Sequence, residues 1–291
     1  MATDTTPRRG DFRFFDRLRV RWAEIDAQKI VFNAHYLMYF DTAVAGYWRA
    51  LALPYAEAME QLGGDLYVKK ATLEYHASAR YVDLLDVARR GERIGTSSMR
   101  FVGCVFRQDE PLVDCELVYV FADPHTQTSK PVPVPLRTLL EGFEAGRPTF
   151  DVRVGRWGEL GEAARAIRTE VFVGEQRIPA ELEWDAADAD ALHALVSNHL
   201  GMPLATGRLM SAEPGVGKIG RMAVRQAVRG SGIGEAMLAS LLDAARGRGD
   251  REVRLNAQRS AEGFYRRAGF AAHGAPFEEA GIPHIEMRRA L

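Results

Sequence analysis

The spacing of apolar residues divides the chain into two stretches that predict different architectures. In the first stretch, apolar side chains recur every three or four positions over residues 33–51, which is typical of a helix. These side chains are Tyr36, Leu37, Phe40, Val44 and Tyr47. After Gly63 and Gly64 the pattern changes to long alternating segments separated by short polar breaks, which predict antiparallel strands over residues 66–123. With a further strand over 13–22, we expect a sheet wrapped around a central helix, an α+β domain.

The second stretch predicts alternating helices and strands. Proline and glycine interrupt the strand pattern over residues 130–149, and we place a domain boundary near Gly146, giving domains 1–146 and 147–291. Helices are expected at about 159–173, 233–246 and 260–268, and strands near 191–198, 203–211, 218–224 and 252–257, with strand-like residues from the last helix to the end. This order predicts an α/β domain.

Length, charge and cysteine content limit the classes of function. A chain of 291 residues fits two domains, and its net charge of −1 lacks the basic excess typical of nucleic-acid binding. The N-terminus shows no signal-peptide pattern, and no apolar run approaches the roughly 18 residues of a membrane span. Cys104 and Cys115 lie in strand-like segments, where we expect buried thiols rather than a disulfide or metal pair. We therefore expect a cytoplasmic protein without metal, nucleic-acid or membrane partners.

Glycines at the start of an expected helix are the first sign of ligand binding. The segment RGSGIGEAML runs from Arg229 to Leu238, and glycine in a helical first turn costs about 1 kcal/mol relative to alanine. Free backbone amides at a helix N-terminus attract anions, so the segment predicts a phosphate-rich ligand. The alternative is a tight strand-to-helix turn without a ligand. The spacing matches neither the dinucleotide fingerprint nor the Walker loop.

This segment resembles the R/Q-x-x-G-x-G/A signature of the GCN5-related N-acetyltransferases (GNAT), with Arg229, Gly232 and Gly234 in the signature positions. Three further segments, VFVGEQ (171–176), NAQ…FY…GF (256–270) and EEAGIPHIEM (278–287), resemble the ElaA branch of that family. The resemblance implies a split sheet that binds acetyl-CoA as co-substrate and transfers its acetyl group to an amine. The implied coenzyme-binding residues are Met222, Val224, Arg229, Gly230, Ser231, Gly232, Ile233, Gly234 and Gln258.

The resemblance also implies catalytic roles in the C-terminal half. Tyr265 would lie near the sulfur and protonate the leaving thiolate, unless it is a partly buried helix tyrosine. Glu175, His193 and His284 are candidates for the base that deprotonates the acceptor, and each has an alternative structural or acceptor-binding role. Glu175 and His284 rank first because they lie in the ElaA-like segments, whereas His193 lies in an apolar strand.

A single carboxylate marks the candidate site of the N-terminal half. Asp26 stands between the strand-like RLRVRW and the expected helix, a position that a simple turn residue also occupies. Asp26, the segment IVFNAH and Tyr36 resemble the 4-hydroxybenzoyl-CoA thioesterase (YbgC-like) group of the hotdog superfamily. Two positions differ from that group: Lys29 stands where glycine is frequent, and Asn33 stands where many members have histidine.

The second resemblance implies acyl-CoA thioester hydrolysis. Asp26 would act as general base or nucleophile, and backbone amides near residues 31–33 would polarise the carbonyl. Asn33 would orient water or substrate, or merely cap the helix. Because sites of this group are completed across a dimer interface, the resemblance implies a homodimer or homotetramer formed through the hotdog domain. The two resemblances together predict a bifunctional coenzyme A enzyme, and the alternative is that one half is a catalytically silent acyl-CoA-binding module regulating the other.

Overall fold

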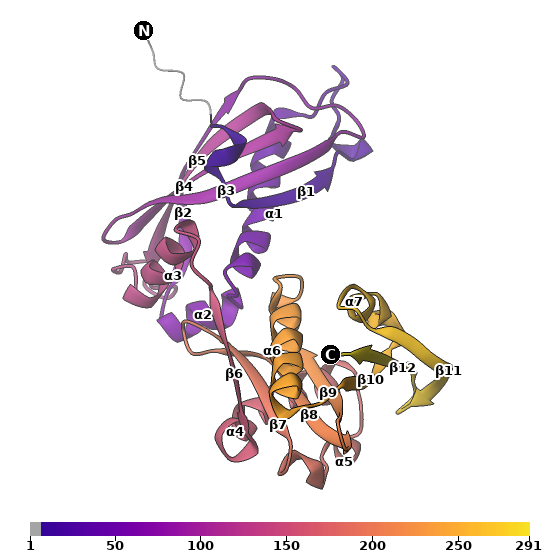
Figure 1. Ribbon diagram of the computed structural model, residues 1–291. Coiled ribbons are helices and arrows are strands. Elements are labelled where there is room, and N and C mark those ends of the chain that lie inside the picture. Colours follow the sequence, from indigo (N-terminus) through magenta and orange to yellow (C-terminus); the bar gives the residue numbers. More distant parts are fainter. Residues whose placement is uncertain (1–6) are drawn as a thin grey trace. The chain divides into compact units, whose positions relative to one another are not determined.

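The computed structural model describes residues 7–291, which divide into two compact units between Thr149 and Phe150. Each unit contains one β-sheet with its own helices (Figure 1). Within the described residues, no helix is both long enough and apolar enough to cross a membrane.

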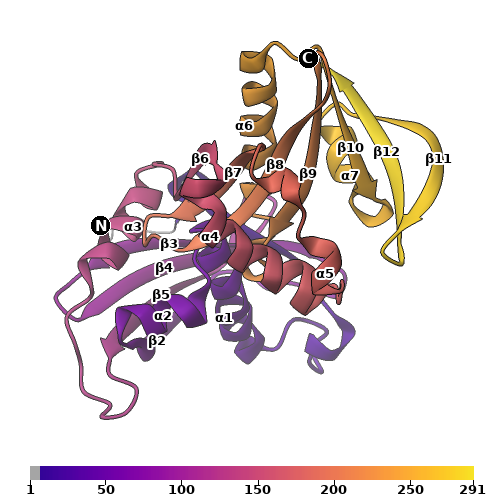
Figure 2. The same ribbon diagram turned by 90° about the horizontal axis from the view of Figure 1, so that it is seen from below.

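The first unit is a five-stranded antiparallel sheet in the order β1-β3-β4-β5-β2. Its elements are β1 (Phe14–Arg19), α1 (Asn33–Ala50), α2 (Tyr55–Leu62), β2 (Asp65–Tyr75), β3 (Leu84–Ile94), β4 (Ser98–Arg107), β5 (Glu110–Ala122) and α3 (Val134–Glu144). The long helix α1 packs on the sheet (Figures 1 and 2), as the apolar pattern predicts.

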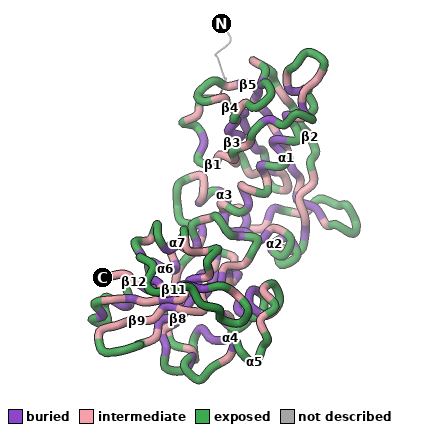
Figure 3. The backbone as a smooth tube through the Cα atoms, turned by 90° about the vertical axis from the view of Figure 1, so that its right-hand side faces the viewer, coloured by how far each residue is buried: buried purple, intermediate pink, exposed green. Residues whose placement is uncertain are grey.

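One face of α1 forms the centre of this core. Its buried side chains are Tyr36, Tyr39, Phe40, Ala43, Tyr47 and Trp48. Gly103 of β4 allows the close approach, because a Cβ there would lie 2.9 Å from the Phe40 ring. Leu37, which the sequence pattern assigns to this face, is instead 40% exposed. Buried positions along α1 and the strands appear in purple in Figure 3.

The prediction of an interruption after the strands is wrong for residues 134–144, which form helix α3. Pro133 precedes this helix and Pro135 lies in its first turn, where the missing N–H and the fixed φ of proline are tolerated. Glu144 at the end of α3 accepts hydrogen bonds from the Tyr47 hydroxyl and from the Gly91 amide, at 2.5 and 2.7 Å. The helix is therefore part of the first unit's core.

The two cysteines are buried thiols, as expected. Cys104 and Cys115 are both free, and burial raises the pKa of the Cys115 thiol to about 12. Burial raises the pKa of Cys104 as well. No group of three or more histidine, cysteine, aspartate or glutamate residues within 7–291 is arranged to hold a metal ion.

The second unit is a seven-stranded sheet in the order β11-β12-β10-β9-β8-β7-β6. Its elements are β6 (Phe150–Arg156), α4 (Trp157–Arg168), a π-helix (Thr169–Glu175), α5 (Ala180–Glu183), β7 (Leu192–Asn198), β8 (Pro203–Glu213), β9 (Val216–Val224), α6 (Ile233–Arg248), β10 (Glu252–Gln258), α7 (Glu262–Arg267), β11 (Ala271–Glu279) and β12 (Ile282–Ala290). Strand β6, which the sequence analysis missed, forms one edge.

The strands at the centre of this sheet separate part way along their length. Strands β9 and β10 are parallel and pair only from Glu252↔Val216 to Leu255↔Ile219. Beyond that point β9 continues to Val224 and β10 to Gln258 without pairing with each other, so the sheet is split. This is the arrangement that the acetyltransferase resemblance implies.

Candidate functional site

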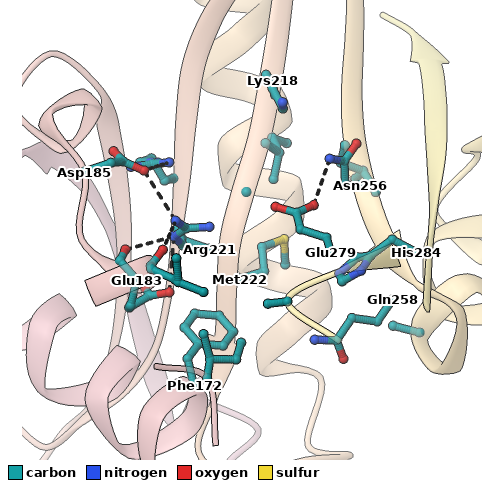
Figure 4. Close-up of a pocket in the computed structure, with 18 of the residues that line it drawn as sticks. Phe172, Glu183, Asp185, Lys218, Arg221, Met222, Asn256, Gln258, Glu279 and His284 are labelled. Atoms are coloured by element: carbon teal, nitrogen blue, oxygen red, sulfur yellow. Dashed lines mark hydrogen bonds and ion pairs between the residues drawn. The ribbon is translucent and has the colours of Figure 1, made fainter. Parts of the chain in front are cut away.

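A cleft of about 640 Å³ lies in the second unit (Figure 4). The unpaired end of β9 contributes Gly220, Arg221 and Met222 to its lining, and the unpaired end of β10 contributes Asn256 and Gln258. A cleft between diverging strands leaves main-chain groups on both sides without sheet partners, so an extended ligand can hydrogen-bond to them.

The three ElaA-like segments converge on this cleft. Gln258 Nε2 donates a hydrogen bond to Gln176 Oε1 at 2.9 Å, joining β10 to the end of the π-helix. In the pairing of β10 with β12, Gln258 lies opposite His284. Together with Phe172 and Tyr265, these residues line the cleft, so segments more than 80 positions apart form one site.

The glycine-rich segment forms a loop at the N-terminus of α6. Gly230 and Gly232 have φ values of +85° and +83°, and a Cβ at either position would meet nothing within 4 Å. The backbone amides of residues 230–235 make no main-chain hydrogen bond within the described chain, because the first helical bond is from the Ala236 amide to the Gly232 carbonyl. Consecutive free amides at a helix N-terminus fit a pyrophosphate.

An ion pair fixes the start of this loop. Arg229 donates two hydrogen bonds to the Glu175 carboxylate, at 2.7 and 2.6 Å, and a third from Nε to the Val224 carbonyl at 2.9 Å. The Arg229 guanidinium lowers the pKa of Glu175. Glu175 is therefore a weak base held beside the glycine-rich loop, and it does not line the cleft.

The other residues expected to bind the coenzyme lie along the same path. Met222 lines the cleft, and Val224 packs 3.7 Å from the Cβ position of Gly234. The Ser231 hydroxyl donates to the Val228 carbonyl at 2.7 Å, and Ile233 is buried in the first turn of α6. These contacts shape the loop and leave its amides available.

Tyr265 and His284 have the properties that proton transfer requires. Burial raises the pKa of Tyr265 to about 12, and its hydroxyl has no hydrogen-bond partner within residues 7–291. His284 Nδ1 lies 2.8 Å from the Ile282 carbonyl oxygen. Because a carbonyl only accepts, Nδ1 carries the proton, and Nε2 of the neutral ring keeps its lone pair.

His193 has a structural position. It is 1% exposed, its Nε2 is 2.9 Å from the Asp188 carbonyl oxygen, and its ring packs on Trp157 at 4.8 Å. Burial lowers its pKa. His193 does not line the cleft, so it does not reach an acceptor there.

One wall of the cleft is an ion network that the sequence analysis missed. Buried Arg168 pairs with Glu183 at 2.5 Å and with Asp188 at 2.8 Å. Arg208 joins Asp188 to Asp185, at 2.8 and 2.6 Å. The members come from α4, α5, the following loop and β8, so no local pattern in the sequence groups them.

In the first unit, Asp26 closes a tight turn before α1. Its Oδ1 accepts hydrogen bonds from the Gln28 amide at 2.8 Å and the Ile30 amide at 3.4 Å. Lys29 has φ +63°, the left-handed conformation that glycine adopts without strain. The turn therefore forms with lysine at the position where the thioesterase group frequently has glycine.

The amides that face this turn differ from those expected. The Val31 amide donates to the Ala79 carbonyl and the Phe32 amide donates to the Glu24 carbonyl, both at 2.9 Å. Phe32 is the N-cap, so Asn33 is the first helical residue rather than the cap. The amides without a main-chain acceptor in the described chain are those of Asn33 and Ala34.

The segments that flank the Asp26 turn carry aromatic side chains, some of them exposed. The buried Tyr36 hydroxyl accepts from the Ala79 amide at 2.8 Å and fixes the 76–80 loop against α1. Trp22 and Tyr81, whose rings contact edge to face at 5.3 Å, are 75% and 47% exposed. Buried Glu24, which the sequence analysis missed, anchors the turn by accepting from the Tyr39 hydroxyl at 2.8 Å.

Comparison with known families separates the two halves in the same way. Residues 20–143 match the thioesterase-like superfamily, and residues 167–291 match the acetyltransferase (GNAT) domain family. The uncharacterized N-acetyltransferase YjcF of Bacillus subtilis is 36% identical over 124 residues, which cover 42% of this chain and 87% of that protein. The UPF0039 protein C11D3.02c of Schizosaccharomyces pombe is 32% identical over 127 residues, 43% of this chain and 84% of that protein.

Similar solved structures include two proteins of Escherichia coli. Escherichia coli ElaA is 29% identical with a TM-score of 0.44, over 48% of this chain and 99% of its own. The probable thioesterase YbaW from Escherichia coli is 21% identical with a TM-score of 0.40, over 44% of this chain and 97% of its own.

Proposed function

Because the chain belongs to the GNAT acetyltransferases through its C-terminal half and to the thioesterase-like (hotdog) superfamily through its N-terminal half, we propose that it is a bifunctional enzyme of coenzyme A thioesters. The C-terminal half transfers an acetyl group from acetyl-CoA to a small amine, and the N-terminal half hydrolyses an acyl-CoA. The observation that carries the first activity is the split between β9 and β10 leading to the free amides of residues 230–235.

In the acetyltransferase half, each residue's role follows from its contacts. The loop amides hold the pyrophosphate, and Arg229, fixed by Glu175, keeps the loop in place. The unpaired edge of β9 at Met222 binds the pantetheine chain. His284 Nε2 accepts a proton from the acceptor amine, and the Tyr265 hydroxyl protonates the leaving thiolate. We thus assign the base to His284 and a positioning role to Glu175.

Replacing Tyr265 with phenylalanine should lower the rate of acetyl transfer about 100-fold, since general acids typically contribute about 10²- to 10⁴-fold. Acetyl-CoA affinity should not change, because the hydroxyl acts only when the thiolate leaves. Because burial raises the pKa of Tyr265 to about 12, the wild-type hydroxyl stays protonated below that pH. Deprotonation of Tyr265 should therefore cause no fall in the rate of acetyl transfer below about pH 12. Steady-state kinetics measures the rate of acetyl transfer, and calorimetry measures the affinity for acetyl-CoA. If Tyr265→Phe transfers acetyl groups at a rate within threefold of wild type, the Tyr265 hydroxyl does not protonate the leaving thiolate.

In the thioesterase half, Asp26 is the proposed base or nucleophile. The free amides of Asn33 and Ala34 are the proposed donors to the thioester carbonyl, in place of the amides of residues 31 and 32, which are already bonded. Such preorganised donors typically contribute a few kcal/mol. Asn33 is exposed at the first turn of α1, where its side chain can orient water or substrate.

We propose that the active form is a homodimer or homotetramer joined through the first unit. Strand β2 ends the sheet and leaves Val68 and Tyr75 exposed, and the Tyr75 hydroxyl donates to the Asn33 carbonyl at 3.2 Å. The free edge therefore reaches the start of α1, where the candidate site lies. Pairing two such edges would cover the exposed apolar residues and place a second chain beside Asp26.

Val68→Arg should convert the oligomer to a monomer. Two-fold symmetry would place the new arginine near the same arginine of the second chain, and the two positive charges would repel each other. Thioester hydrolysis should fall at least about tenfold, as a shared site loses its second chain. Sedimentation velocity and thiol release measure both effects. Val134→Arg, at an exposed valine of α3, is the matched control. A monomeric wild type with full thioesterase activity would contradict the shared site.

Thiol release from a panel of acyl-CoAs, with and without amines, tests the combined proposal. Amine-independent release should require Asp26, and amine-dependent release should require Tyr265. If the first unit binds acyl-CoAs but no acyl-CoA is hydrolysed, the alternative of a silent regulatory module is correct for that half. The two free, buried cysteines support a cytoplasmic location, where thiols stay reduced.

A further inference from the structure

One lysine in the acetyltransferase cleft has no balancing carboxylate. Lys218 lies on β9 and lines the cleft at the end remote from the phosphate loop, since the loop follows the opposite end of the strand (Figure 4). It is the only lysine in residues 147–291, where every other basic side chain apart from histidine is arginine. No ion pair or side-chain hydrogen bond joins it to any residue described in 7–291.

The neighbouring arginines are already neutralised. Arg208 pairs with Asp185 and Asp188, at 2.6 and 2.8 Å. Arg221 pairs with Glu183 and Asp185, both at 3.3 Å, and dashed lines in Figure 4 mark its contacts on this wall. Lys218 is therefore the cation of this wall that is available to bind an anionic ligand. Arg208 and Arg221 would have to give up their carboxylate partners to bind the same ligand.

A carboxylate with no cationic partner among residues 7–291 lies elsewhere in the same cleft. Glu279, at the end of β11, accepts a hydrogen bond from the neutral Asn256 side chain at 3.2 Å. Figure 4 shows Glu279 and His284 close together, on the opposite side of the cleft from Arg221 and Glu183. An ammonium group beside Glu279 would be held near the base that we propose to deprotonate it.

The space between the thioester position and Lys218 is open. Lys218 precedes Met222 by four residues, at most roughly 13 Å along a strand that rises about 3.3 Å per residue and bulges at Arg221, where φ is +51°. Between them lies Gly220, where a Cβ would meet nothing within 4 Å. The register pairs Gly220 with Arg208 and Lys218 with Met210, so these positions share one face of the sheet. A short ligand can extend along this face without displacing a side chain.

We propose that the acetyl acceptor is a small zwitterion, a primary amine that also carries a carboxylate or phosphate. Its amine lies beside Glu279 and His284, and its anionic group binds Lys218. This inference rests on the proposed acetyltransferase activity and specifies its substrate class.

The transfer balances with the groups present. The ammonium loses one proton to His284 Nε2, and the amine nitrogen then forms a bond to the acetyl carbon as the carbon–sulfur bond breaks. Tyr265 gives its proton to the sulfur and regains one from the acylated nitrogen. His284 returns its proton to solvent, so the reaction yields an N-acetyl product, the free thiol and one released proton.

A matched set of amines tests the proposal on the full-length protein. Glycine, β-alanine, γ-aminobutyrate and aminoethyl phosphate carry both charges, whereas butylamine and putrescine lack the anion. Wild type should prefer the acid-bearing amines. Lys218→Met should lower their kcat/KM about 10- to 100-fold, mainly through KM, as expected for one charge-assisted hydrogen bond. Lys218→Arg should retain most of the activity, and Arg246→Met, which removes an exposed positive charge outside the cleft, should have no effect.

Calorimetry on the coenzyme A-saturated protein gives a second readout that needs no turnover. The acid-bearing amine that wild type uses best should bind wild type at least about tenfold more tightly than Lys218→Met. A preference for putrescine or butylamine, absence of binding by every acid-bearing amine, or an unchanged Lys218→Met would overturn the proposal. If acetyl-CoA itself fails to bind, the proposed acetyltransferase activity fails first, and the two failures are thereby distinguished.

Discussion

Asp26→Asn should lower thioester hydrolysis by about 10²- to 10⁴-fold, the usual contribution of a general base. The substitution keeps the turn, because the asparagine Oδ1 can still accept from the Gln28 and Ile30 amides. It removes the negative charge that a base or a nucleophile needs. Thiol release from the best acyl-CoA substrate measures the change, and acetyl transfer in the same protein should be unaffected.

Asp41→Asn is the matched control for this experiment. Asp41 is exposed on α1 in the same unit, and its loss changes net charge by the same amount. This variant should hydrolyse thioesters like wild type, and both variants should unfold at nearly the wild-type temperature. If Asp26→Asn keeps more than about a tenth of the wild-type rate, its charge is not the catalytic group.

Gly232→Asp should weaken acetyl-CoA binding about 100-fold more than Gly232→Asn. Both side chains tolerate the positive φ of this position better than other residues, and they have nearly the same size. The difference between them therefore reports charge. A carboxylate among the amides of residues 230–235 would oppose the pyrophosphate, and at about 4 Å such repulsion reaches several kcal/mol near a protein surface. Calorimetry with acetyl-CoA measures both affinities.

Gly249 provides the control at the opposite end of the same helix. It has φ +88° and open space around its Cβ position, as Gly232 has, but it caps the C-terminus of α6. Gly249→Asp and Gly249→Asn should bind acetyl-CoA equally well, even though an acidic residue at a helix C-terminus costs some stability. Equal affinities for the two Gly232 variants would show that the loop does not hold the phosphates. Gly232→Val is a weaker probe, because a branched residue is strained at this φ.

Most strands of the two sheets were predictable because their signals are local. Alternation over residues 66–123 and the helical spacing after residue 33 depend on neighbours within one element, and both predictions are confirmed. The same reasoning fails for α3, where the proline content predicts an interruption and the structure has a helix. Prolines before a helix and in its first turn remove no hydrogen bond that the helix would form, so composition alone is misleading there.

Sequence motifs identified the candidate residues, but they did not show which of these residues can accept or donate a proton. Glu175 and Arg229 are 54 positions apart, and only their contact shows that the carboxylate holds the start of the glycine-rich loop and is a poor base. His284 gains its free Nε2 through the Ile282 carbonyl. At Lys29 the sequence indicates a departure from the thioesterase group, but the structure shows that the local backbone is kept. Lys29 adopts the left-handed conformation that is expected of the glycine frequent at this position.

The sequence by itself determined most of the elements and their order, the two coenzyme A-related halves, and the positions of the Asp26 turn and the Arg229–Gly234 loop, because each depends on residues adjacent in the chain. Only the tertiary structure decided which charges in the cleft are paired. Arg208 and Arg221 are neutralised by carboxylates from other elements, whereas Lys218 and Glu279 have no such counterions in the described part of the chain. Ion pairing depends on distances of a few ångströms between elements, and such distances are fixed by packing rather than by any local pattern.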